Sequence, residues 1–177
     1  VFGDAGWSTR GESGRILIGT QVLEQSLDID ADFLISRFAP TDMLMQRLGR
    51  LWRHSETPRA ASARCEAWLL APKLEHAEAE PHTAFAASAA VYAPYVLCRS
   101  LAVWQPREAV TLPQDIRPML EASYRERAEE GMLARWKQEL FSGTPRRKGL
   151  DTLRQLARLT LSGAGQTLPE SLSLIHI

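Results

Sequence analysis

The chain has 177 residues, enough for one domain or one and a half, and its 45% hydrophobic and 24% charged residues predict a packed globular core. Lys plus Arg and Asp plus Glu number 21 each, so the formal net charge is +0 and any surface that binds nucleic acid must be local. No apolar run of about 18 residues occurs and no signal peptide opens the chain, so we predict a cytoplasmic protein with no membrane partner.

Residues 1–14 contain four glycines among scattered polar side chains and predict a loop. Because the first residue is Val1 rather than Met, we expect the chain to be a segment of a longer protein. Cys65 and Cys98 have no second Cys or His at metal-ligand spacing, which predicts free, apolar thiols of an intracellular protein. We therefore assign no metal site to this chain.

Short apolar runs that alternate with helical patterns predict an open, mostly parallel α/β sheet. Residues 16–18 and 33–35 are continuous apolar runs, typical of strands buried on both faces of such a sheet. A short helix is expected between them at 22–25. A longer helix is expected to begin with Thr41 as its N-cap, and residues 66–70 predict a further strand.

The sequence changes character after residue 72, where a polar connector leads into helical patterns. Helices are expected at 83–103, interrupted by Pro94, and at 113–124, 126–141 and 149–161. His76 and His82 of the connector are six positions apart, which is not a ligand spacing on a helix, so we interpret the connector as solvated. The chain thus divides into an α/β part, residues 1–72, and a mostly α-helical part, residues 73–177.

The helix that follows Thr41 is predicted to carry Gln46, Gly49, Arg50 and Arg53 on one face. At about 100° per residue, the last three fall within about 60° of Gln46. Two guanidiniums a turn apart suit a polyphosphate, because Arg offers planar, bidentate donors to phosphate oxygens. Gln46 would orient the attacking water or hold a phosphate oxygen, and Gly49 would let a ligand or a facing backbone approach closely. The alternative interpretation is an amphipathic helix with a basic, solvated face.

A second polar cluster follows the first predicted strand and contains Gly19, Thr20, Asp28 and Asp30. Ligand loops of open α/β sheets lie at the carboxyl ends of strands. Gly19 and Thr20 could offer a backbone N–H and a hydroxyl to a phosphate. Asp28 or Asp30 could accept a hydrogen bond from a ribose hydroxyl, or both could serve turns before the second strand.

A complete nucleotide site would need further motifs. The 177 residues contain no Gly-x-x-x-x-Gly-Lys-Ser/Thr, no Lys before Lys73 and no acidic pair after a strand that would hold Mg²⁺. We therefore predict that the chain supplies only the arginine half of a composite ATP site, and that it is inactive alone.

Two motifs give the chain a family resemblance. Residues 19–28 (Gly-Thr-Gln-Val-Leu-Glu-Gln-Ser-Leu-Asp) resemble motif V of superfamily 2 helicases, and residues 46–53 (Gln-Arg-Leu-Gly-Arg-Leu-Trp-Arg) resemble their motif VI. The sequence of residues 24–30 resembles that of one family, the helicase–nuclease recruited by type I CRISPR systems. Residues 112–124 resemble a segment of the same family's C-terminal region.

The resemblance implies that residues 1–72 are the distal half of a second RecA-like helicase lobe and that residues 73–177 are a truncated helical C-terminal domain. It implies a parent chain with an HD nuclease domain and a first RecA-like lobe, using ATP with Mg²⁺. The implied partners are single-stranded DNA and a CRISPR RNA-guided surveillance complex. Trp52 stands where the family often has His, and we expect it on the apolar side of the helix without loss of function.

The motifs also imply residue roles. Arg50 and Arg53 would be γ-phosphate fingers with Gln46 beside them, Asp28 would contact the ribose, Gly49 would lie at the nucleotide, and Gly19, Thr20 and Gln21 would contact DNA. Two alternatives stay open: another superfamily 2 helicase acting on RNA or DNA, and a lobe without motor activity that only binds nucleic acid or a partner.

Overall fold

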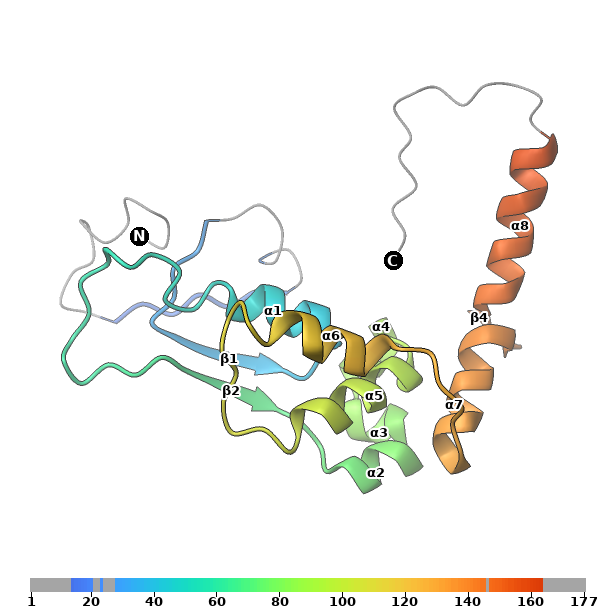
Figure 1. Cartoon of the computed structure of the whole chain (residues 1–177), viewed down its shortest axis with the longest axis horizontal. Coiled ribbons are helices and arrows are strands. Elements are labelled where there is room, and N and C mark those ends of the chain that lie inside the picture. Colours follow the sequence, from blue (N-terminus) through green and yellow to red (C-terminus); the bar gives the residue numbers. More distant parts are fainter. Residues whose placement is uncertain (1–13, 21–22, 24–27, 146, 164–177) are drawn as a thin grey trace. The chain divides into compact units, whose positions relative to one another are not determined.

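The structure is a computed structural model that describes residues 14–20, 23, 28–145 and 147–163 (Figure 1). The chain packs as two compact units, Val1–Ala128 and Glu129–Ile177, and each is described here by itself. This division concerns packing, so the boundary that we predict near residue 72 between a helicase lobe and an accessory domain stays a prediction.

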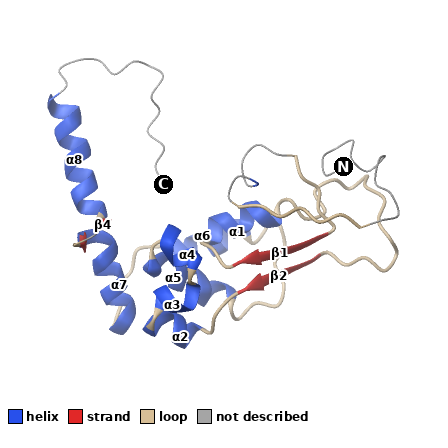
Figure 2. Ribbon diagram, turned by 180° about the vertical axis from the view of Figure 1, so that it is seen from behind, coloured by secondary structure: helices blue, strands red, loops and turns tan. Residues whose placement is uncertain are grey.

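A parallel β–α–β arrangement forms the α/β part of the first unit. Strand β1 (Phe33–Arg37) pairs in parallel with β2 (Glu66–Leu70), and helix α1 (Thr41–Leu48) lies between them in the sequence. Figures 1 and 2 show the two arrows side by side and pointing the same way. The predicted α/β class and both of these strands are thereby confirmed.

The strand predicted at 16–18 is wrong. These residues form no strand, and Ile16 and Ile18 are each 89% exposed. An apolar run is buried as a strand only where a neighbouring strand satisfies its backbone and packing layers cover its faces, and within the described residues β1 pairs with β2 alone. Most of the short helix predicted at 22–25 lies outside the described residues.

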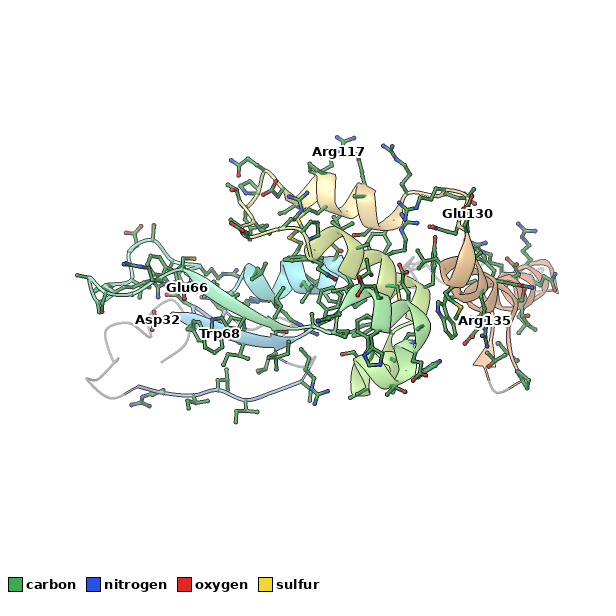
Figure 3. All side chains as sticks on the ribbon, turned by 90° about the horizontal axis from the view of Figure 1, so that it is seen from below. Asp32, Glu66, Trp68, Arg117, Glu130 and Arg135 are labelled. Atoms are coloured by element: carbon green, nitrogen blue, oxygen red, sulfur yellow. The ribbon has the colours of Figure 1, made fainter. Side chains whose placement is uncertain are left out.

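One face of the two-stranded sheet is open and apolar. Alternate residues of a strand point to opposite faces, and the register places Phe33 beside Glu66 and Ile35 beside Trp68. The large apolar side chains of this open face are 42–59% exposed: Phe33, Ile35, Trp68 and Leu70. Phe33 and Trp68 meet edge to face with ring centres 5.4 Å apart. Figure 3 labels Trp68 on the sheet.

Helix α1 is anchored at its start by buried hydroxyl groups. The prediction that Thr41 is the N-cap is wrong, because Pro40 holds that position and Thr41 is the first helical residue. The Thr41 hydroxyl instead accepts from the Trp104 indole N–H (3.1 Å) and shares a hydrogen bond of 2.6 Å with Ser123. The Thr41 N–H donates to the Ser100 hydroxyl at 3.1 Å. A side chain that faces a tertiary partner cannot also turn back to cap its own helix.

Within the described residues of the first unit, five further helices follow: α2 (Leu74–Ala79), α3 (Pro81–Phe85), α4 (Ala87–Val91), α5 (Pro94–Trp104) and α6 (Ile116–Tyr124). The helical segment predicted at 83–103 is divided into α3, α4 and α5; the predicted interruption at Pro94 is confirmed, whereas the break at Ala86 was not predicted. The breaks fall at Ala86, whose φ is 47°, and at Pro94, which begins α5 because its ring fixes a helical φ and its missing N–H needs no partner there.

Helices α5 and α6 carry much of the apolar core. The buried core side chains include Phe38, Phe85, Leu97, Leu101 and Met119. Cys98 is fully buried, and burial raises the pKa of its thiol to about 12, so it packs as a small apolar residue, as predicted. Both thiols are free, as predicted, and Cys65 is exposed.

The second unit contains α7 (Gly131–Ser142), a short antiparallel pair β3 (Gly143–Thr144) and β4 (Arg147–Lys148), and α8 (Leu150–Gly163). The helices predicted at 126–141 and 149–161 are therefore confirmed with shifted starts. No helix within the described ranges is long and apolar enough to cross a membrane.

Candidate nucleotide-phosphate site

Helix α1 ends before it reaches Arg50 and Arg53. Helix α1 ends at Leu48, and Gly49, Arg50 and Leu51 continue in turns closed by N–H bonds to Met45, Arg47 and Leu48. The helical wheel that placed Arg50 and Arg53 on one face with Gln46 is therefore wrong beyond Leu48. Periodicity could not reveal this end, because the apolar spacing continues through Leu51.

Residues 50–53 instead pair with the acidic segment that precedes β1. Ala31 donates its N–H to the Arg50 carbonyl (2.8 Å), and Trp52 donates its own to the Ala31 carbonyl (2.9 Å). Ala31 and Leu51 form a parallel bridge. This pairing, rather than a helix, fixes where both candidate arginines leave the backbone, and it joins the second motif to the segment that follows the first.

Trp52 adopts an unusual backbone conformation between the two arginines. Its φ is 49°, in the left-handed region that a bulky residue enters only where surrounding contacts hold it there. Its indole N–H donates to the Asp32 carbonyl at 3.0 Å, and the guanidinium of Arg59 lies 4.9 Å from the ring centre. The expectation that Trp52 sits on the apolar side of a helix is therefore wrong.

Asp30 is the buried centre of this region, with 1% of its surface exposed. One carboxylate oxygen accepts from the Arg53 N–H (2.9 Å) and from Arg59 (2.5 Å), and the other accepts from the Thr57 hydroxyl (2.5 Å). Burial alone would raise the pKa of Asp30, but the hydrogen bonds from Thr57 and Arg59 and the charge of Arg59 outweigh it and hold the pKa below its ordinary value. Asp30 therefore stays charged and structural, which favours the turn interpretation over a ribose contact.

Asp28 and Arg53, which we predicted for separate roles, contact each other. Arg53 Nε lies 3.0 Å from an Asp28 oxygen, and both side chains are 42% exposed. His54 Nε2 lies 3.1 Å from each Asp28 oxygen. The ion pair presents a guanidinium and a carboxylate together at the surface, where a ligand could reach both.

The other predicted residues lie around this pairing. Gln46 is exposed on the last turn of α1, Arg50 is half-buried in the following turn, and Gly19 and Thr20 are exposed in a segment without regular structure. Gln21 lies outside the described residues.

Gly49 is exposed and has a right-handed φ of −63°, so its backbone does not require glycine. An added Cβ would meet backbone oxygens of Met45 and Gln46 at 3.5 Å, an ordinary contact distance.

Sequence reasoning missed Thr57 and Arg59. Their partner Asp30 lies 27 and 29 positions earlier, beyond the reach of any local pattern. The usable signal was Asp30 itself, because a carboxylate between Ile29 and Ala31 at the edge of an apolar strand must find donors if it is buried. Arg47 was also unassigned; it donates to the Ser36 hydroxyl (2.8 Å) and the Arg37 carbonyl (3.0 Å), and ties α1 to β1.

The donor set suits phosphate. Guanidiniums of Arg50 and Arg53 and the amide of Gln46 are the group types that bind phosphate oxygens. Within the described ranges no three His, Cys, Asp or Glu side chains gather as a metal site would need. A parallel β–α–β unit whose helix leads into an arginine segment paired with an acidic loop is the arrangement that the structure shows at this site.

Comparisons with known proteins show which proteins the chain is similar to. The family model described as CRISPR-associated nuclease/helicase Cas3, C-terminal, matches residues 2–56. The CRISPR-associated nuclease/helicase Cas3 of Streptococcus thermophilus is 40% identical over 110 residues, which cover 62% of this chain and 11% of that protein. The chain therefore spans a small part of this relative's length.

Solved structures agree with the sequence matches. The crystal structure of T. fusca Cas3 with AMPPNP matches with a TM-score of 0.64 and 25% identity, covering 96% of this chain and 18% of that one. A chain of a CRISPR RNA-guided surveillance complex in a pre-nicking state matches with a TM-score of 0.59 and 29% identity, covering 92% and 18%. The resemblance drawn from the two motifs is thereby confirmed: the chain corresponds to a C-terminal segment of the Cas3 helicase–nucleases.

Proposed function

We propose that this chain is the phosphate-facing segment of the second motor lobe of an ATP-dependent, single-stranded DNA translocase that acts with a nuclease domain in CRISPR interference. The observation that carries the proposal is the pairing of residues 50–53 with residues 30–32, which sets two arginines beside an acidic loop. The match to T. fusca Cas3 with AMPPNP supports a nucleotide at this lobe.

In this proposal the residues divide the work of hydrolysis. Arg50 and Arg53 stabilise the negative charge that develops on the γ-phosphate, and Gln46 orients the attacking water. Asp28 reaches the ribose, while Gly19, Thr20 and Gln21 contact the DNA backbone. Mg²⁺ and the lysine that grips the β- and γ-phosphates belong to a first RecA-like lobe of the parent chain, so this segment alone hydrolyses no ATP.

The same proposal names the partners of this segment. A first RecA-like lobe and an HD nuclease domain of the parent chain complete the machine, and single-stranded DNA passes across the lobes. The match to a chain of a surveillance complex supports recruitment by an RNA-guided assembly. Contacts to the strand would go mainly to phosphates, so binding would weaken steeply with salt.

Arg50→Ala in the parent helicase tests the assignment. Because an arginine finger acts on the transition state, we expect DNA-stimulated ATP turnover to fall by about 10³-fold or more while nucleotide affinity changes little. Turnover is measured by phosphate release, and affinity by titration with a fluorescent nucleotide. Arg117→Ala, which removes an exposed guanidinium of α6, is the matched control. Turnover of Arg50→Ala equal to that of the parent helicase would overturn the finger assignment.

A further inference from the structure

We propose that Arg59 is a positioning residue for ATP hydrolysis, because it fixes the backbone of the candidate finger Arg53 through Asp30. We call Asp30, Thr57 and Arg59 the Asp30 clamp. The inference rests on the proposed function and adds to it two residues, Thr57 and Arg59, that lie outside both helicase motifs.

The clamp closes on the backbone of Arg53 rather than on its side chain. The same Asp30 oxygen that accepts from Arg59 at 2.5 Å also accepts the Arg53 N–H at 2.9 Å. The Thr57 hydroxyl occupies the other oxygen at 2.5 Å, so the carboxylate cannot rotate without breaking a charge-assisted bond. The Arg53 side chain stays 42% exposed, as a group that must reach a ligand requires.

Arg59 also holds the residue before Arg53. Its guanidinium lies over the Trp52 ring and forms a second ion pair with Asp32, whose backbone carbonyl accepts from the Trp52 indole. One guanidinium therefore contacts both sides of the paired segments, and only 8% of its side chain is exposed. Trp52 is held at its positive φ by these same contacts.

A buried ion pair is a poor choice if stability is all that is needed. Removing Asp30 and Arg59 from water opposes folding, and well-packed apolar residues often stabilise a fold as well or better. What the charged pair adds is a fixed geometry, since the planar fork of Arg accepts few arrangements. An arginine finger that is displaced by about 1 Å can lower the rate of hydrolysis by about 10²-fold, so a fixed position of Arg53 matters for catalysis.

Arg59→Lys in the parent helicase is the test. Lys keeps the positive charge and the long stem but cannot bridge Asp30 and Asp32 with one planar fork. We expect kcat of the DNA-stimulated ATPase to fall by about tenfold or more, with KM for ATP within about twofold of the parent value. Arg117→Lys is the matched control, because it makes the same change at an exposed ion pair with Glu121, and we expect it to leave both constants unchanged. Figure 3 labels Arg117 on α6.

Each outcome decides the proposal. Unchanged kcat in folded Arg59→Lys overturns it. A fall in activity that matches only a loss of folded protein, measured by circular dichroism and by nucleotide-binding stoichiometry, also overturns it, because the role is then structural. If Arg59→Lys does not fold, Thr57→Val replaces it: it removes one hydrogen bond to Asp30 and should lower kcat without changing KM.

Failure of the proposed function gives a different signature. A parent helicase without DNA-stimulated ATPase activity would contradict the motor role of the lobe, and Arg59 could then position nothing for hydrolysis. A parent helicase with normal turnover, in which Arg50→Ala is inactive but Arg59→Lys and Thr57→Val keep full kcat, would contradict the clamp alone.

Discussion

Asp30 is charged although it is almost fully buried, so the free energy of unfolding depends on whether its carboxylate is protonated. The pKa of Asp30 is lowered in the folded protein, so the carboxylate contributes stability that is fully present above the ordinary pKa near 3.8 and is lost as pH falls through the lower, folded pKa. We expect Asp30→Asn to reduce the free energy of unfolding at pH 6 by about 1.5–3 kcal/mol, since charge-assisted hydrogen bonds are lost without a change of size.

Urea unfolding of the chain at several pH values between 6 and 3 measures this effect. The difference between the original chain and Asp30→Asn should shrink as the pH falls, because acid removes the charge from the original chain too. A difference that stays constant over this range would mean that Asp30 does not titrate with folding. Asp151→Asn, an exposed change in α8, is the control for a general effect of charge.

At the residue scale the sequence identified the participants better than their contacts. The motifs predicted separate roles in the site for Arg53 and Asp28, and the structure joins these two residues in one ion pair. Arg59 was missed because its role depends on Asp30, which is distant in the chain. Composition and spacing report which side chains are available, whereas tertiary pairing decides which of them meet.

At the scale of elements, the start of α1 depends on a buried hydroxyl. Thr41→Val keeps the shape of the side chain but leaves the Trp104 N–H and the Ser123 hydroxyl without this partner in a buried site. We expect a loss of about 1–3 kcal/mol for each stranded group, seen as a lower urea midpoint with an unchanged slope. Thr41→Ser should retain most of the stability, because it keeps the oxygen.

Thr83→Val, at an exposed position of α3, should leave the midpoint unchanged. Equal midpoints for Thr41→Val and the original chain would show that the hydroxyl network contributes nothing to stability. A loss of the same size in Thr41→Ser would assign the effect to the methyl group instead.

Helices and strands could be predicted where a few neighbouring residues in the sequence mark them. The strands at β1 and β2 stand out as apolar runs, and Pro94 marks the start of α5. The end of α1 was not predictable, because the force that ends it is the pairing of Leu51 with Ala31. The run at 16–18 has a stronger apolar signal than either strand, yet it is exposed, because a strand needs a neighbour as well as a sequence.

At the scale of the whole molecule, the open face of the sheet leaves large apolar side chains exposed to solvent. Parallel sheets are buried on both faces, yet Phe33, Ile35, Trp68 and Leu70 are 42–59% exposed on one side. In a parent helicase such a face would be covered by the rest of the lobe. For the chain alone, contiguous apolar surface of this kind drives association.

We therefore expect the isolated chain to associate as its concentration rises, and Ile35→Thr with Trp68→Thr to reduce that association. Thr has high β-propensity, so the substitutions remove apolar surface without opposing the strands. Sedimentation velocity over a range of concentrations measures the effect, and Val91→Thr on α4, which is also an exposed apolar position, is the control. A chain that stays monomeric at every concentration would show that this face needs no cover, and a reduction of equal size in Val91→Thr would show that exposed apolar area in general, rather than the sheet, drives the association.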